Sequence, residues 1–264
     1  MLLIAIKQSL GSNIMLLNLA GKTALITGSS KGIGFAIAQA LHAEGCIVAL
    51  NARNSDQLIK AAGELKGSVA IAGDVTKANE AHEVVNEATQ LLGGLDILVC
   101  SVGGGQSVAP GCESPEDWQK IFALNLWSAT NVIESSLGAL ERSKGVILCI
   151  SSICGLEVIP GAPLTYSSAK AALNSYIRGI ARPLGKKGIR INAIAPGNIL
   201  FEGSVWARKL AEDKDRVIAM LDQSVSLNRL GAPQDIGSLS SYLVSERANF
   251  VTGGIWTLDG GQTH

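Results

Sequence analysis

The sequence predicts an α/β fold in which short buried strands alternate with helices. Aliphatic runs of strand length recur along the chain, and helical patterns lie between them. The first run, 23–27, is joined to the helical pattern 35–44 by the glycine-rich turn 28–34. A chain of 264 residues is long enough to bury a core, and it shows no domain-scale repeat or low-complexity linker. We therefore expect one domain.

Composition argues against several classes of function. Lysine plus arginine equals aspartate plus glutamate, at 22 each, which argues against nucleic acid as the main partner. The five cysteines are scattered without a Cys-x-x-Cys pair, so we expect reduced thiols in a cytoplasmic protein and no metal site. No uninterrupted apolar run reaches membrane-spanning length, so we expect no membrane partner.

Residues 1–18 are interpreted as an N-terminal extension to a domain at 19–264. Met1–Ile6 is apolar but lacks the basic leader and cleavage site of a signal peptide. Met15 lies just before Leu19, where the regular pattern begins. We expect Met15 to be the natural start and the residues before it to pack loosely.

Two motifs suggest chemistry. The turn Gly28-Ser29-Ser30-Lys31-Gly32-Ile33-Gly34 lets the backbone approach a pyrophosphate at a helix N-terminus, although glycine turns occur in many folds. Further on, Tyr166 and Lys170 are four residues apart on a predicted helix, so their side chains share a face. A nearby ammonium favours the phenolate, and we expect Lys170 to lower the pKa of Tyr166 and poise it as an acid or base.

Together, Thr27–Gly34 and Tyr166-x-x-x-Lys170 resemble the short-chain dehydrogenase/reductase family over about Leu19 to Gly261. The resemblance implies a single-domain Rossmann fold: a doubly wound, mainly parallel seven-stranded sheet with helices on both faces, and a nicotinamide cofactor. The cofactor-binding residues that we expect are Gly28, Ser30, Lys31, Gly32, Ile33, Gly34, Arg53, Asp74, Val75, Gly103, Tyr166, Lys170, Pro196, Gly197 and Ile199.

The residues after the second strand, 46–50, bear on the choice of cofactor. No acidic residue stands between Cys46 and Asn54 to hold the ribose 2′-hydroxyl of NAD. Arg53 and Lys31 suit a 2′-phosphate instead, because charge-assisted bonds to phosphate are strong. We therefore expect NADP(H), with two solvated surface charges as the alternative.

The next two strands lead to further candidate contacts. After strand 69–73, the family places Asp74 and Val75 along the adenine, although Asp74 could merely cap the helix at 77–92. Strand 95–100 continues with Cys100-Ser101-Val102-Gly103 where the family has Asn-Asn-Ala-Gly. The missing asparagines remove polar braces of the sheet, and the glycines that follow predict a flexible lip.

The resemblance implies a catalytic set of Asn125, Ser152, Tyr166 and Lys170. A helix capped by Ser114 runs to Asn125, which would hold a water of a proton relay or satisfy a kinked backbone. Strand 145–150 ends in Ser151-Ser152, where Ser152 would orient the substrate carbonyl. No His-Asp partner for that serine is evident, which disfavours a hydrolase.

The C-terminal third completes the predicted site. The helix of Tyr166 runs to about Ala181, and strand 188–195 leads to Pro196-Gly197-Asn198-Ile199, which the family places at the nicotinamide carboxamide. Phe201 stands where relatives often carry threonine, and about 198–228 is predicted to be a substrate lid. The strand at 253–261 resembles a subunit contact, so we expect a homotetramer, although it could equally pack within its own subunit.

The predicted activity is reversible hydride transfer between a nicotinamide and a carbonyl or secondary alcohol. The pattern resembles 3-oxoacyl-acyl carrier protein reductases of fatty acid biosynthesis, so the favoured substrate is a 3-oxoacyl thioester on acyl carrier protein or coenzyme A. Lys144, Lys186 and Lys187 are candidate contacts to a carrier, or plain solvated lysines. A sugar, polyol or steroid-like alcohol is the alternative within the family. A non-catalytic dinucleotide-binding regulator is the alternative outside it.

Overall fold

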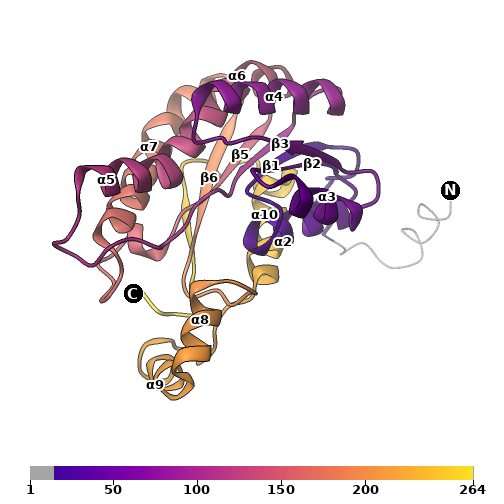
Figure 1. Cartoon of the computed structure of the whole chain (residues 1–264). Helices are drawn as coiled ribbons and strands as arrows, with labels where there is room; N and C mark the ends of the chain where they lie inside the picture. The colour runs from indigo at the N-terminus through magenta and orange to yellow at the C-terminus, as the bar shows by residue number, and fades with distance from the viewer. Residues whose placement is uncertain (1–14, 264) are drawn as a thin grey trace, which may run out of the picture.

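The computed structural model describes residues 15–263, and their strands form one seven-stranded sheet (Figure 1). Each neighbouring strand pair is parallel, and the order is β3-β2-β1-β4-β5-β6-β7. The strands are β1 (Thr23–Thr27), β2 (Ile47–Ala52), β3 (Val69–Ala72), β4 (Ile97–Cys100), β5 (Val146–Ile150), β6 (Arg190–Pro196) and β7 (Ile255–Leu258). The predicted doubly wound architecture is confirmed.

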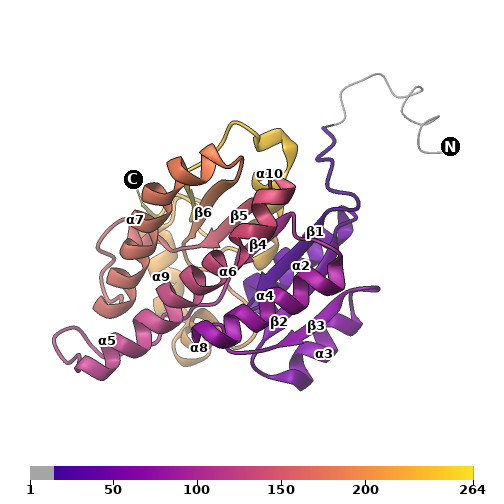
Figure 2. The ribbon, with the colours of Figure 1, turned by 90° about the horizontal axis from the view of Figure 1, so that it is seen from above.

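Helices cover both faces of the sheet, as Figure 1 and the view from above in Figure 2 show. One face carries α2 (Gly32–Ala43), α3 (Ser55–Gly63) and α10 (Pro233–Val244). The other carries α4 (Ala78–Leu92), α6 (Ser128–Ser143) and α7 (Leu164–Lys186). Helix α5 (Pro115–Phe122) packs against α7 at one end of this layer.

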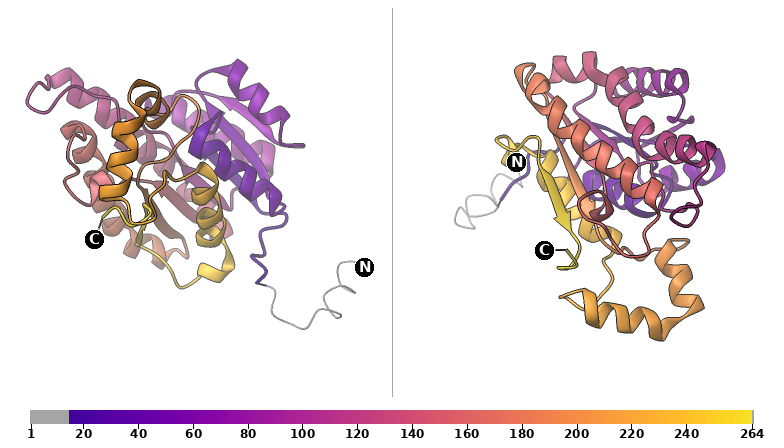
Figure 3. Two further views of the ribbon diagram at one scale, coloured as in Figure 1. Left: turned by 90° about the horizontal axis from the view of Figure 1, so that it is seen from below. Right: turned by 90° about the vertical axis from the view of Figure 1, so that its left-hand side faces the viewer.

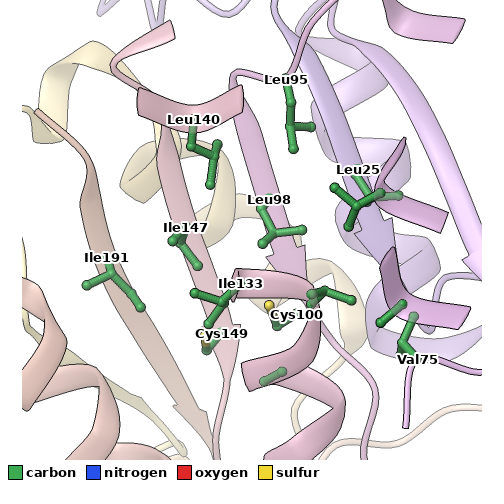
Figure 4. Close-up of a cluster of buried hydrophobic side chains, with 14 of the residues drawn as sticks. Leu25, Val75, Leu95, Leu98, Cys100, Ile133, Leu140, Ile147, Cys149 and Ile191 are labelled. Carbon is green, nitrogen blue, oxygen red and sulfur yellow. The ribbon is translucent and has the colours of Figure 1, made fainter. Parts of the chain in front are cut away.

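Alternate residues of each strand supply the two cores. In β5, Ile147 and Cys149 face the core under α4, α6 and α7, while Val146, Leu148 and Ile150 face the core over α2, α3 and α10. Figure 4 shows the first core, in which strand side chains such as Leu98 and Ile147 meet Ile133 and Leu140 of α6. Strands buried on both faces read as unbroken aliphatic runs, which is why the sequence located them.

Helices α8 (Val205–Glu212) and α9 (Lys214–Ser224) lie within the predicted lid region and project away from the sheet (Figure 3). They have a small apolar cluster of their own, built on Val217, Leu221 and Val225 with Trp206 packed against it. This separate cluster lets the pair of helices form a unit at the carboxyl edge of the sheet.

Some element boundaries differ from the prediction. Helix α7 continues past Ala181 to Lys186 and contains Pro183. Helix α3 was not predicted, although Asn54 caps it by accepting from the backbone N–H of Gln57 at 3.0 Å. Asn125 lies in a π-helical turn, Ala123–Trp127, that joins α5 to α6. Ser114 does cap α5, in a reciprocal capping box with Asp117.

The expectation for residues 1–14 lies outside the described residues. Just after them, the carbonyl of Leu16 accepts from Arg247 Nε at 2.7 Å, and Asn18 donates to Glu246 at 3.1 Å. Leu17 packs against the core over α2 and α10. Within residues 15–263, no helix has the length and apolar character needed to cross a membrane.

Candidate active site

Most of the predicted site residues follow strands at one edge of the sheet. Parallel strands place their carboxyl ends together, and ligands of such sheets bind there, beside the point where strand order reverses. That point lies between β1 and β4. The residues that follow successive strands are Gly28 after β1, Arg53 after β2, Asp74 after β3, Gly103 after β4, Ser152 after β5 and Gly197 after β6.

Ser152 and Tyr166 meet directly, from the turn after β5 and the first turn of α7. Ser152 caps a short 3-10 turn, Ile153–Gly155, and its Oγ accepts from the backbone N–H of Cys154 at 3.2 Å. The Ser152 side chain lies near enough to the Tyr166 phenol to act on its pKa. The pair therefore presents two hydroxyl groups side by side at the end of β5.

Lys170 lies one helical turn beyond Tyr166 and is only 3% exposed. Its Nζ donates to the carbonyl of Ile150 at 2.8 Å and lies 6.0 Å from the centroid of the Tyr166 ring. The sequence prediction that both side chains share one face of the helix is therefore met. The ammonium, however, is directed at a carbonyl rather than at the phenol.

The predicted lowering of the Tyr166 pKa is not found. Burial raises the pKa of Tyr166 to about 12, against a smaller opposing effect of the Ser152 side chain. Burial also lowers the pKa of Lys170 to about 8. The physical reason is common to both groups, since loss of water disfavours phenolate and ammonium alike.

Asn125 is 1% exposed and fixes the loop after β4. Its Oδ1 accepts from the backbone N–H of Gly104 at 3.0 Å, and its Nδ2 donates to the carbonyls of Gly104 and Ile121, each at 3.1 Å. The glycine segment expected to be a flexible lip is thus held at Gly104 by two bonds. π-Helical turns often occur at functional sites, and here one aims an asparagine at the loop.

Gly103 lies where Asn125 and Lys170 converge. A Cβ atom placed on Gly103 would be 3.0 Å from Asn125 Oδ1 and 3.1 Å from Lys170 Nζ. Both polar atoms therefore face the same backbone position, beside the hydroxyl pair of Ser152 and Tyr166. These contacts bring all four predicted catalytic residues into one neighbourhood.

The glycine-rich turn has the shape that a dinucleotide phosphate requires. Gly28 and Gly32 have φ of 65° and 59°, a region that favours glycine, and a Cβ on Gly34 would collide with the carbonyl oxygen of Gly28. Lys31 is the N-cap residue that precedes α2, so its charge stands at the positive helix end. The residues present therefore fit a phosphate group.

Phe201 covers part of this turn. A Cβ atom on Gly32 would lie 2.6 Å from Cε2 of Phe201, so the ring rests on the glycine backbone. The same ring borders a cavity of about 430 Å³ whose other lining residues include Lys31, Gln57 and Lys60. Sequence analysis noted Phe201 as a departure from the family but gave no indication of this contact.

The two cations expected at a 2′-phosphate are placed differently from each other. Lys31 lines the cavity beside Gln57 and Lys60 of α3, whereas Arg53 is not among its lining residues. Arg53 is exposed and lies near Asp74, whose pKa its charge helps to lower. Lys60 is thus a candidate cation that the sequence analysis missed, because α3 itself was not predicted.

Asp74 is held in place by its own neighbours. Its Oδ1 accepts from the backbone N–H and the hydroxyl of Thr76, at 3.1 and 2.8 Å. Burial raises its pKa, but these bonds and the charges of Arg53 and Lys77 outweigh that effect and lower the pKa overall. Lys77 occupies the N-cap position of α4, so Asp74 is not the cap of that helix. Val75, the adjacent candidate, is 2% exposed.

The segment after β6 is fixed by the C-terminal strand. The backbone N–H of Gly197 donates to the carbonyl of Leu258 at 3.0 Å. A Cβ on Gly197 would lie 2.7 Å from Cβ of Asp259, so glycine is needed there for packing. Pro196 ends β6, and Ile199 is a buried member of the core over α2 and α10.

Comparisons with known proteins agree with this geometry. A family model described as "Enoyl-(Acyl carrier protein) reductase" matches residues 28–263. Glucose 1-dehydrogenase 2 of Bacillus subtilis is 31% identical over 93% of this chain and 96% of its own. L-sorbose reductase of Gluconobacter frateurii, solved with NADPH and L-sorbose, is 31% identical with a TM-score of 0.89, covering 94% of this chain and 98% of its own. A 7α-hydroxysteroid dehydrogenase solved with NADH and 7-oxo glycochenodeoxycholic acid is 31% identical with a TM-score of 0.86, covering 94% and 96%.

The fold and the site define a Rossmann-type oxidoreductase that acts on an alcohol or a ketone. The chain belongs to the short-chain dehydrogenase/reductase family.

The ring on Gly32 leads to a prediction about cofactor binding. A ring lying on the phosphate-binding turn must move before phosphates reach the backbone, and this reduces the apparent affinity. We expect Phe201→Ala to lower the dissociation constant for NADPH roughly fivefold, measured by fluorescence titration. Phe250→Ala is the matched control, because the Phe250 ring is fully exposed. Weaker NADPH binding in Phe201→Ala would mean that the ring supports the cofactor instead of covering its site.

Proposed function

We propose that this protein catalyses the reversible, NADP(H)-dependent reduction of a ketone to a secondary alcohol on a sugar, polyol or steroid-like molecule. The observation that carries the proposal is the meeting of Ser152, Tyr166 and the buried Lys170 at the end of β5, where Lys170 Nζ lies 6.0 Å from the centroid of the Tyr166 ring. The nicotinamide supplies the hydride when it is bound.

Tyr166 is the proton donor in the direction of reduction. With its pKa raised to about 12, the phenol holds its proton throughout the neutral range. The Ser152 side chain lies near that phenol, so a carbonyl oxygen placed against both hydroxyls would receive two hydrogen bonds. As negative charge develops on that oxygen, the phenol proton lies within transfer range.

Lys170 and Asn125 assist the proton transfer from Tyr166. Lys170 places a positive charge near the phenol, which eases transfer of the phenolic proton once substrate is present. Asn125 and Lys170 both face Gly103, which suits the supply of a proton from the interior side of the site. In this proposal Asn125 has the structural and the relay role together.

The proposed preference for NADP(H) depends on cations near the glycine turn. Lys31 and Lys60 border the cavity beside that turn, and Arg53 follows β2 where an NAD site usually has an acid. Cofactor-bound relatives include one with NADPH and one with NADH, so the family alone leaves the choice open. The charges of this chain favour the 2′-phosphate.

The proposed substrate class follows the relatives rather than the thioester favoured by sequence. The names of these relatives refer to glucose, L-sorbose and a hydroxysteroid, and none of them refers to a thioester. The lysines expected to meet an acidic carrier protein are partly engaged: Lys144 donates to the carbonyl of Lys187, and Lys187 pairs with Glu141 at 3.0 Å. A 3-oxoacyl thioester is the second candidate, which the description of the family model favours.

The proposal also includes a cytoplasmic homotetramer. None of the five cysteines is in a disulfide, which suits a compartment where thiols stay reduced. Strand β7 is at the edge of the sheet, and its Trp256 is 39% exposed. An edge strand with exposed aromatic surface is suited to pairing with a second copy. Light scattering should give four times the chain mass, and a stable monomer at micromolar concentration would contradict this part.

Replacing Tyr166 with phenylalanine tests the proposed chemistry. Tyr166→Phe removes the proton donor and leaves the ring, so turnover should fall by roughly 10²- to 10⁴-fold while NADPH binding changes little. Oxidation of NADPH would be followed with a ketohexose, a 3-oxosteroid and acetoacetyl-coenzyme A. Tyr242→Phe on α10 is the matched control. Wild-type turnover with acetoacetyl-coenzyme A alone would favour the thioester, and unchanged turnover in Tyr166→Phe would end the proposed mechanism.

Removing single cations tests the cofactor preference. We expect Arg53→Ala and Lys60→Ala each to raise the KM for NADPH roughly tenfold and to leave the KM for NADH unchanged. Arg178→Ala, an exposed arginine of α7, is the control. If Lys60→Ala alone raised the KM for NADPH, the 2′-phosphate would bind beside α3 and not beside the end of β2. A wild-type preference for NADH would contradict the proposed cofactor.

A further inference from the structure

Helix α7 carries a third polar residue in line with Tyr166 and Lys170. Asn174 follows Lys170 by four residues, as Lys170 follows Tyr166, so the three side chains lie along one stripe of the helix. Asn174 is 2% exposed. Asparagine disfavours a helix interior and needs partners when buried, so its position demands an explanation.

Both ends of the Asn174 amide bond to the turn that carries Ser152. The Oγ of Ser151 donates to Asn174 Oδ1 at 2.6 Å, and Asn174 Nδ2 donates to the carbonyl of Gly155 at 3.0 Å. Ser151 immediately precedes Ser152, and Gly155 ends the 3-10 turn that Ser152 caps. The two bonds therefore bracket Ser152 on both sides.

The surroundings leave this turn little freedom. A Cβ atom on Gly155 would lie 2.6 Å from the backbone carbonyl carbon of Lys170, so the turn rests directly on α7. On its other side, the carbonyl of Ile150 accepts from Lys170 Nζ. Hydrogen bonds in so buried a place are strong, and losing one leaves its partner group unsatisfied.

We propose that Asn174 is a positioning residue that fixes the Ser152 hydroxyl against the Tyr166 hydroxyl. Tyr166 belongs to α7, whereas Ser152 belongs to the turn after β5, so their separation depends on how that turn is joined to the helix. Asn174 connects the turn to the helix through its hydrogen bonds with Ser151 and Gly155. The inference rests on the proposed reduction, in which both hydroxyls contact one carbonyl oxygen.

The first test measures how kcat changes when the hydrogen bonds of the Asn174 side chain are removed. Asn174→Ala should lower kcat for ketone reduction between roughly 10- and 100-fold, because a small displacement of Ser152 spoils the alignment of both hydroxyls. The dissociation constant for NADPH should stay within about twofold. Ser151→Ala removes only one of the two bonds and should give a smaller fall in kcat in a chain that folds even if Asn174→Ala does not. Normal kcat in folded variants would overturn the proposal.

A matched control separates positioning from general destabilisation. Asn192 in β6 is also buried, and its amide also makes two hydrogen bonds. It donates to the carbonyl of Val251 at 2.8 Å and accepts from the backbone N–H of Gly254 at 3.1 Å. Asn192→Ala should lower the melting temperature about as much as Asn174→Ala but leave kcat unchanged. Equal loss of kcat in both variants would overturn the proposal.

A double-mutant cycle asks whether Asn174 acts through Ser152. In a Ser152→Ala background no hydroxyl remains to be positioned, so Asn174→Ala should cost no further kcat. A purely structural role would give the full loss in both backgrounds. If Asn174→Ala lowered kcat as much in the Ser152→Ala background as in the wild-type background, the proposal would be overturned.

Crystal structures give a readout that needs no turnover. In the ligand-free Asn174→Ala variant, Ser152 Oγ should lie farther from the Tyr166 hydroxyl than in the wild-type protein, whereas in Asn192→Ala this distance should not change. If the wild-type protein turned over no ketone, the proposed function would fail, yet these structures would still decide the positioning role. An unchanged Ser152–Tyr166 pair in Asn174→Ala would overturn it.

Discussion

The burial of one ammonium group organises this active site. Lys170 is almost fully enclosed, and an enclosed cation is costly unless it is well hydrogen-bonded. The carbonyl of Ile150 provides that bond and joins α7 to the end of β5. Gly103 and Gly155 approach so closely that a Cβ on either would crowd Lys170. The loop after β4, the turn after β5 and α7 are thus packed around a single side chain.

The same enclosure determines the charge states of the site. Burial holds Tyr166 neutral, with a pKa near 12, and brings the pKa of Lys170 down to about 8. A phenol with so high a pKa is a poor base in the ligand-free protein, but it holds the proton that reduction needs. Because the pKa of Lys170 is depressed, its ammonium is kept below pH 8 and is lost as the pH rises through that value. The motif Tyr-x-x-x-Lys alone gave the direction of the tyrosine shift incorrectly, because it says nothing about desolvation.

The sequence predicted what depends on local patterns. Strands β1 and β5 read as aliphatic runs because both of their faces are buried, and Ser114 was recognised because capping needs only three neighbouring residues. Three features of the site depend on contacts between distant segments and escaped prediction. They are the π-helical turn at Asn125, the ring of Phe201 on Gly32, and the bonds from Asn174 to the turn after β5. Asn174 did give a signal, since a polar residue on the Tyr166–Lys170 stripe is unexpected in a helix interior.

The segment after β4 lacks the two asparagines that the family resemblance led us to expect, and other groups brace the sheet there. Cys100 is buried in the core, and Val102 packs on Gly28, where a Cβ would meet it at 3.1 Å. The polar brace comes from β1: the hydroxyl of Thr27 donates to the carbonyl of Val99 at 3.3 Å and accepts from the N–H of Ser101 at 3.2 Å. A single buried hydroxyl thus ties β1 to the end of β4 at the point where strand order reverses. Gly28 follows β1 directly, and Gly103 lies in the loop that begins at Ser101 after β4. Thr27 therefore helps to set the spacing between the glycine turn and the loop that faces Lys170.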